Sequence, residues 1–182
     1  MPAIGFGTME LPHRPVELVA AAIAGGYRHI DTARKYGTEE RVGEGIRASG
    51  IARKDLFVTT KVTELDAREA DFLRSAETSL KALGLDYVDL LLVHWPQPKV
   101  PFTETLGALA KAKRRGMAHH FGVSNFTLAM LDEAVSVCPE PLVTNQIEYH
   151  AYLPQDRMIA ALKRYGMILT AYCPVARGKL LD

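Results

Sequence analysis

Seven short apolar runs recur along the chain, separated by stretches that have the length and spacing of helices. The runs are rich in Val, Ile, Leu and aromatic residues and do not alternate cleanly with polar residues, which is typical of parallel strands covered on both faces. The predicted strands are residues 3–6, 27–30, 56–60, 88–93, 121–123, 143–147 and 167–172. An order of strand, helix and strand predicts a parallel sheet with right-handed crossovers.

The stretches between the runs carry apolar stripes at helical spacing, which predicts six helices. One stripe follows Pro15, a favourable first helical residue, and consists of Val16, Val19, Ala20 and Ile23. Similar stripes lie within residues 72–83 and 106–110. Glycines that follow a helical stretch and precede a strand are expected to be C-terminal caps; these are Gly25, Gly50, Gly84, Gly116 and Gly166.

Periodicity does not distinguish a closed barrel from an open sheet, but the placement of polar residues favours the barrel. An open dinucleotide-binding sheet carries a Gly-x-Gly-x-x-Gly turn after its first strand. The first strand here leads into residues 5–10, which carry only two of those glycines, Gly5 and Gly7. Polar candidates instead follow strand after strand, as at the C-terminal rim of a (β/α)8 TIM barrel. We therefore predict an α/β fold of that type.

The number of strands falls short of a whole barrel. Seven strands and six helices are predicted within 182 residues, whereas a complete barrel has eight strands in about 250 residues. We expect one domain over residues 1–182, truncated before the last strand and helices, with open edges on the first and last strands. The favoured explanation is that these residues are the ordered or cloned part of a longer protein; the alternative is a partner that completes the sheet.

Composition narrows the class of protein. Lys and Arg total 22 against 21 acidic residues, a balance that argues against broad affinity for nucleic acid or anionic membrane. Cys138 and Cys173 are the only cysteines and have no metal-ligand spacing, so we expect neither a disulfide framework nor a metal site. With no leader or membrane-span pattern, the chain is expected to be soluble, cytoplasmic and monomeric.

Four polar residues near predicted strand ends have the chemistry of a carbonyl-reducing site: Asp31, Tyr36, Lys61 and His94. A carbonyl that accepts hydride develops negative charge on oxygen and needs an acid. Free tyrosine is a poor acid at neutral pH, with a pKa of about 10, but a nearby lysine ammonium favours phenolate and lowers that pKa. A carboxylate can hold the lysine, and a neutral histidine can hydrogen-bond the carbonyl oxygen.

The segments that carry these residues closely resemble the aldo-keto reductase family, and most of all its small bacterial members of the 2,5-diketogluconate reductase type. The matching segments are residues 26–37, 58–61 and 89–96. The resemblance implies NADPH-dependent reduction of aldehydes or ketones, with a small-molecule carbonyl as the binding partner. It assigns Tyr36 as the proton donor and Lys61 as the residue that lowers the pKa of Tyr36. Asp31 is assigned as the partner of the lysine, and His94 as the group that orients the carbonyl.

The resemblance also implies the cofactor contacts. Ser124, Asn125 and Gln146 would hold the nicotinamide carboxamide, which both donates and accepts hydrogen bonds. Tyr172 would stack on the nicotinamide ring. Gly7, Thr8 and Pro174 complete the expected cofactor set. NADPH is expected from the family alone, with NADH as an alternative, because the segment that holds the 2′-phosphate in relatives lies beyond Asp182.

Each candidate also has a simpler interpretation. Asp31 alone would be a turn or helix cap, Ser124 and Asn125 would be an ordinary N-cap before residues 127–135, and Tyr172 would be a core aromatic. Two other functions are also considered. Lys61 could form a Schiff base in a barrel aldolase, or the chain could be a non-catalytic, reductase-like subunit that senses nucleotide.

Overall fold

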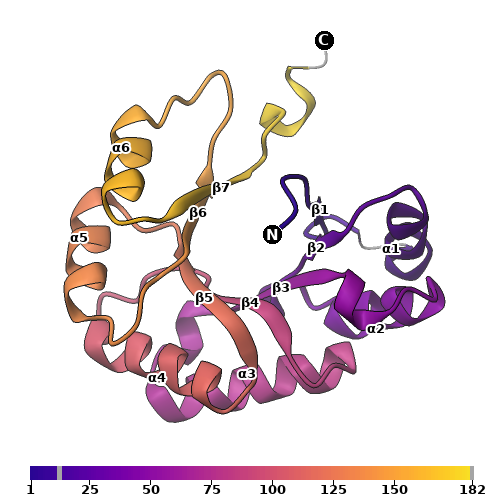
Figure 1. Cartoon of the computed structure of the whole chain (residues 1–182), viewed down its shortest axis with the longest axis horizontal. Coiled ribbons are helices and arrows are strands. Elements are labelled where there is room, and N and C mark those ends of the chain that lie inside the picture. Colours follow the sequence, from indigo (N-terminus) through magenta and orange to yellow (C-terminus); the bar gives the residue numbers. More distant parts are fainter. Residues whose placement is uncertain (12–13, 181–182) are drawn as a thin grey trace.

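The computed structural model describes residues 1–11 and 14–180, which form seven strands and six α-helices. The strands pair in chain order, all in parallel, and curve into a nearly closed barrel with the helices outside (Figure 1). The strands are β1 (Phe6–Gly7), β2 (His29–Asp31), β3 (Phe57–Val62), β4 (Val88–Val93), β5 (Ala118–Ser124), β6 (Thr144–Glu148) and β7 (Ile168–Tyr172). The helices are α1 (Pro15–Ala24), α2 (Glu39–Ala48), α3 (Glu69–Leu83), α4 (Phe102–Arg114), α5 (Leu128–Val137) and α6 (Asp156–Arg164). The predicted fold class is confirmed.

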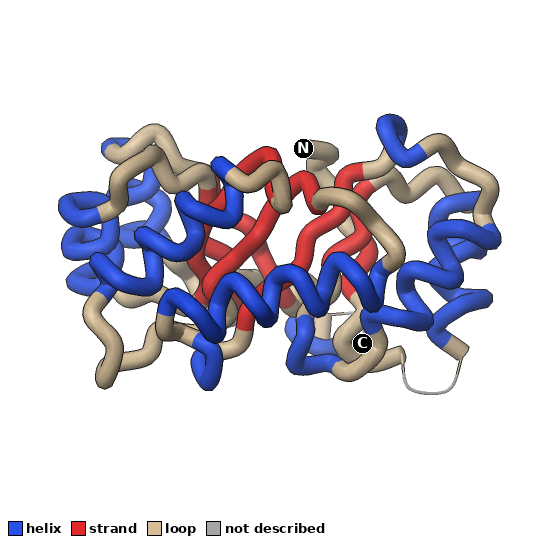
Figure 2. Tube along the Cα trace, turned by 90° about the horizontal axis from the view of Figure 1, so that it is seen from below, coloured by secondary structure: helices blue, strands red, loops and turns tan. Residues whose placement is uncertain are grey.

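The main apolar core lies between the sheet and the helix layer. In side view the strands occupy the centre and the helices flank them (Figure 2). Helix α3 contributes the fully buried Phe72 and Leu83, and α4 contributes Leu106 and Leu109. Full burial of each such side chain stabilises the fold by roughly 1.5–3 kcal/mol relative to an exposed one. No α-helix in the described part of the chain is both long and apolar enough to cross a membrane.

Six of the seven strands differ from their predicted limits, and β1 and β5 differ most, since each begins three residues away from its predicted start. Residues 3–5 were predicted as strand, but β1 consists of Phe6 and Gly7 alone. The backbone at Gly5 passes so close to His29 that a Cβ there would lie 2.8 Å from the ring Nδ1. Strand β5 begins earlier than predicted. Its first half contains the exposed His119 and His120, which interrupt the apolar pattern used to predict strands.

Four of the five predicted glycine caps have the expected backbone conformation. Gly50, Gly84, Gly116 and Gly166 have φ between 67° and 76°. At the end of α1, however, Gly25 has φ −73°, and it is the next residue, Gly26, that takes the positive value of 103°. Gly25 is therefore the C-cap of α1, as predicted, and only the left-handed conformation is displaced by one residue, to Gly26.

One face of β3 points into the barrel interior, and the other points into the helix layer. His29 and Thr59 meet inside the barrel, where the imidazole Nε2 lies 2.9 Å from the hydroxyl. Lys61, two residues further along, points into the same interior because alternate side chains of a strand share a face. Thr60 points the other way, into the helix layer. The barrel mouth therefore receives a buried lysine from near the C-terminal end of β3.

Candidate active site

The four residues of the predicted tetrad lie together at the C-terminal ends of β2, β3 and β4. Asp31 ends β2, Tyr36 ends the following 3-10 helix η1 (Arg34–Tyr36), Lys61 lies in β3, and His94 follows β4. The buried Lys61 ammonium forms an ion pair with the Asp31 carboxylate and donates to the Thr32 carbonyl at 2.9 Å. Its Nζ also lies 3.5 Å from the Tyr36 hydroxyl. Lys61 is thus directly linked to both Asp31 and Tyr36.

His94 completes the group by packing on the Tyr36 ring. The rings of His94 and Tyr36 pack edge to face, with their centroids 5.7 Å apart. Burial, assisted by the charges of Lys61 and Lys35, lowers the pKa of His94 to about 4. The imidazole is therefore neutral at pH 7. Its buried Nδ1 makes no hydrogen bond within the described residues.

The electrostatics of Tyr36 correct one sequence-based expectation. Burial raises the pKa of the phenol above its ordinary value of 10, and the nearby Asp31 carboxylate acts in the same direction. Lys61 lowers the pKa of Tyr36, as predicted, but its effect is smaller than that of burial. The net shift is upward because the half-buried phenol loses hydration that would stabilise its anion. At neutral pH the hydroxyl therefore keeps the proton that a donor requires.

The expected carboxamide-binding residues form one hydrogen-bonded network. The Ser124 hydroxyl donates to the Gln146 carbonyl at 2.8 Å. The Asn125 amide donates to the Ser124 hydroxyl at 3.0 Å and to the His94 carbonyl at 2.9 Å. The Tyr172 hydroxyl donates to the Asn125 Oδ1 at 3.0 Å. The side chains of Ser124, Asn125 and Tyr172 are therefore fixed relative to one another and to the main-chain carbonyls of Gln146 and His94.

A contact across the barrel joins this network to the tetrad. The Gln146 amide on β6 donates to Asp31 Oδ2 on β2 at 2.8 Å, although the two residues are 115 apart in the sequence. Asp31 thereby binds Lys61 with one oxygen and Gln146 with the other. Sequence reasoning placed both residues in the site but did not predict this bond, because nothing local in the sequence relates the two strands.

The simpler interpretation of Ser124 and Asn125 as an N-cap is wrong. The cap of α5 is Thr127, whose hydroxyl accepts from the Met130 amide. Ser124 is fully buried at the end of β5, and Asn125 has a left-handed φ of 63°. A non-glycine residue in that region is uncommon and is often associated with a functional site.

The remaining predicted cofactor residues lie in three different environments. Thr8 is fully buried, and both its amide and its hydroxyl donate to the Asp31 carbonyl, at 3.0 and 3.1 Å. This residue therefore fixes the main chain at Asp31. Gly7, the last residue of β1, has open space where a Cβ would stand. Pro174 is exposed in the turn after β7.

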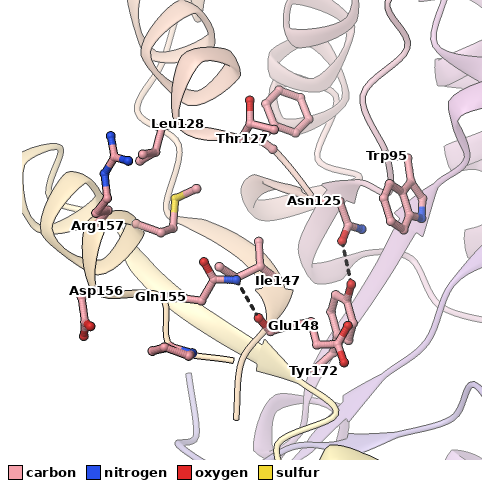
Figure 3. A pocket seen from close by; sticks show the side chains of 13 residues that line it. Trp95, Asn125, Thr127, Leu128, Ile147, Glu148, Gln155, Asp156, Arg157 and Tyr172 are labelled. Carbon is pink, nitrogen blue, oxygen red and sulfur yellow. Dashed lines mark hydrogen bonds between the residues drawn. The ribbon is translucent and has the colours of Figure 1, made fainter. Parts of the chain in front are cut away.

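A pocket of about 610 Å³ opens beside these groups (Figure 3). Trp95, Asn125 and Tyr172 line it on the side of the tetrad. The end of β6, the following loop and the start of α6 form a second part of the wall, whose polar residues are Glu148, Gln155, Asp156 and Arg157; Glu148 lies next to Tyr172, its partner on β7. The Gln155 amide donates to the Glu148 carbonyl at 3.0 Å. Sequence reasoning missed this second wall because its residues form no recognisable motif.

Comparisons with known proteins agree with this geometry. A sequence model of the Aldo/keto reductase family matches residues 3–182. The chain is 40% identical to a methylglyoxal reductase of Escherichia coli, over 100% of this chain and 69% of that protein. Two solved structures are similar. One is described as a candidate 2,5-diketo-D-gluconic acid reductase B (TM-score 0.94, 42% identity, 100% of this chain and 66% of that chain). The other is a Bombyx mori aldo-keto reductase in complex with NADP (TM-score 0.87, 35% identity, 95% and 62%).

The matched region is only part of each relative. The chain spans 65% of the length of the first curated relatives that it matches.

Proposed function

The chain belongs to the aldo/keto reductase family, and from that premise we propose that it acts in the NADPH-dependent reduction of aldehydes or ketones to alcohols. In this proposal the Tyr36 hydroxyl gives its proton to the carbonyl oxygen as hydride reaches the carbonyl carbon. Lys61 and Asp31 support the donor, and His94 orients the carbonyl. The substrates are small carbonyl compounds, in line with the methylglyoxal reductase among the relatives.

The observation that carries the proposal is the set of contacts of Lys61. Its ammonium has three acceptors: the Asp31 carboxylate, the Thr32 carbonyl and the Tyr36 hydroxyl. A positive charge held beside the phenol stabilises the phenolate left behind after proton donation, and the Asp31 carboxylate keeps that charge in place. The same engagement argues against a Schiff-base aldolase, because a nucleophilic amine needs a free lone pair.

His94 is suited to orient the substrate. Because its pKa is lowered to about 4, the imidazole is neutral at physiological pH and binds a carbonyl oxygen without competing with Tyr36 as an acid. Its edge-to-face packing on the phenol sets both groups at the same point of the barrel mouth. A carbonyl oxygen within reach of both side chains would accept a hydrogen bond from each.

The residues on the β5, β6 and β7 side fit a nicotinamide. A carboxamide both donates and accepts, and Ser124, Asn125 and Gln146 supply a hydroxyl and two amides. The hydroxyl of Ser124 gives one hydrogen bond and receives one, so it retains a lone pair. Tyr172, held through its hydroxyl, offers a ring face for stacking. When bound, reduced NADP supplies the hydride; the NADP complex of the Bombyx mori relative supports this choice.

The decisive experiment compares Tyr36→Phe with the unmodified protein, using methylglyoxal and NADPH and following absorbance at 340 nm. We expect turnover to fall by at least about 100-fold, since general acid catalysis contributes 10²–10⁴-fold. Affinity for NADPH, measured by fluorescence quenching, should stay within about twofold. Tyr165→Phe is the matched control, because it removes an exposed hydroxyl that contacts only Asp132 among the described side chains. Full turnover by Tyr36→Phe would refute the proposal.

A further inference from the structure

One buried acid in the helix layer has no part in the function proposed above. Glu39 is the first residue of α2 and only 4% exposed. The Thr60 hydroxyl donates to its Oε1 at 2.6 Å, and the Arg34 guanidinium lies 3.8 Å from its Oε2. A buried carboxylate is costly to desolvate, and an apolar side chain would fill the same space without that cost. Its contacts therefore call for an explanation.

Those contacts connect the two segments that carry the acid and its lysine. Thr60 precedes Lys61 on β3 and points to the opposite face of the strand, so a bond to Thr60 fixes the strand from behind. Arg34 begins η1, the short helix that ends at Tyr36. Glu39 thus bridges β3 and η1 from outside the barrel.

The turn between Tyr36 and Glu39 is short and conformationally defined. Gly37 takes a left-handed φ of 68° and closes η1 by donating its amide to the Arg34 carbonyl. Thr38 then leads directly into α2. Because only two residues separate Tyr36 from Glu39, anchoring the carboxylate on Thr60 restricts where the phenol can lie relative to β3. The Tyr36 hydroxyl lies 3.5 Å from Lys61 Nζ in this arrangement.

We propose that Glu39 is a positioning residue, which holds Tyr36 and Lys61 at the separation that proton donation requires by bridging Thr60 and Arg34. The inference rests on the proposed function, because it describes how residues outside the barrel position the proposed proton donor, Tyr36. Glu39 touches no reacting atom; it acts through Thr60 on β3 and Arg34 on η1.

The charges around Glu39 suit this role. Arg34 faces it from η1, Lys61 lies on β3, and Ser79 approaches from α3. Burial raises the pKa of Glu39 above its ordinary value, while Thr60, Ser79, Arg34 and Lys61 each favour the charged form. Removal of the Thr60 hydroxyl therefore takes away the largest of the contacts that stabilise the carboxylate.

The test replaces the donor, not the acid, to keep the change small. Thr60→Val removes the hydroxyl with little change in shape. Thr105→Val is the matched control, because Thr105 is equally buried and its hydroxyl donates at 2.9 Å to the Ala67 carbonyl, away from the tetrad. Two quantities are measured on each protein: kcat for methylglyoxal reduction, and the titration of 13C-labelled Tyr36 Cζ by NMR. The NMR titration reports on the phenol whether or not the protein turns over.

We expect Thr60→Val to lower kcat roughly 10- to 100-fold, with KM for NADPH unchanged. Its Tyr36 resonance should titrate at higher pH than in the parent, because Lys61 is less well placed to stabilise phenolate. Thr105→Val should match the parent in both measurements. Glu39→Gln, which retains an acceptor for Thr60, should keep more activity than Glu39→Leu.

An unchanged Tyr36 titration in Thr60→Val, or equal losses of kcat in Thr60→Val and Thr105→Val, would overturn the inference. A parent protein that reduces no carbonyl would instead refute the proposed function. In that case the Tyr36 titration alone decides whether Glu39 positions the pair.

Discussion

Acidification should destabilise the protein through His94. The folded pKa of His94 is about 4, against 6.5 for the free side chain. Between these values the unfolded chain binds a proton that the folded chain does not, so stability is fully present above pH 6.5 and is lost as pH falls through 4. At about 1.36 kcal/mol per pKa unit, the loss attributable to His94 between pH 7 and pH 4 is about 3 kcal/mol.

The measurement compares the parent with His94→Gln by urea unfolding at pH 7 and pH 4, followed by circular dichroism. Glutamine is polar and uncharged, and it cannot take up the proton. Burial also lowers the pKa of His29 and raises that of Glu39, but both groups are present in both proteins and cancel in the comparison. The parent should therefore lose about 3 kcal/mol more than His94→Gln over this pH range.

Two results would contradict this reasoning. Equal losses of unfolding free energy in the two proteins would mean that His94 is not held neutral by burial and by Lys61. An NMR titration of the His94 ring with a midpoint near 6.5 would mean the same. Either result would also remove the basis for a neutral, orienting histidine in the proposed mechanism.

Three further outcomes are expected. Asp31→Asn leaves the buried Lys61 without its anionic partner and should lower the free energy of unfolding by about 3 kcal/mol in urea titrations. Gly43→Ala would place a Cβ 2.1 Å from the Leu83 carbonyl and should cost about 1–3 kcal/mol, whereas Gly107→Ala, with nothing within 4 Å, should raise Tm. Gln146→Ala removes a proposed carboxamide contact and should raise the Kd for NADPH about tenfold by fluorescence titration.

The sequence was sufficient to predict the parallel strands and the gathering of Asp31, Tyr36, Lys61 and His94 at one rim, whereas the roles of these residues rest on the family resemblance and stay predictions. Apolar runs without alternation indicate strands covered on both faces, and polar residues at the ends of those runs gather at one rim of a parallel barrel. Asp31, Lys61 and His94 follow this rule directly. The limits of β1 and β5 were less predictable. In β5, His119 and His120 interrupt the apolar pattern, and before β1 the backbone of Gly5 lies close to the His29 ring, a contact that the sequence does not indicate.

The supporting contacts of the site could not be predicted, because they join residues that are distant in sequence. Thr8, whose contact with the cofactor stays a prediction, donates from its hydroxyl and its amide to the Asp31 carbonyl, and nothing in the sequence indicated these bonds. Nothing local in the sequence distinguishes Glu39 from the adjacent Glu40, and only the hydrogen bond from Thr60 in the structure does so. The net pKa shift of Tyr36 likewise depends on its burial, which sequence does not report.

The bond between Gln146 and Asp31 has a consequence for the order of folding. It closes a segment of 115 residues, for which the length-dependent entropy of closure is about 4 kcal/mol. The pairing of Asp31 with Lys61 spans only 30 residues and belongs to neighbouring strands, so it forms at lower cost. Asp31 and Lys61 can thus pair when the first strands form. Gln146 joins them only when the sheet has curved into the barrel and brought β6 opposite β2. In refolding experiments, the ability to bind a nicotinamide should therefore return later than the secondary structure.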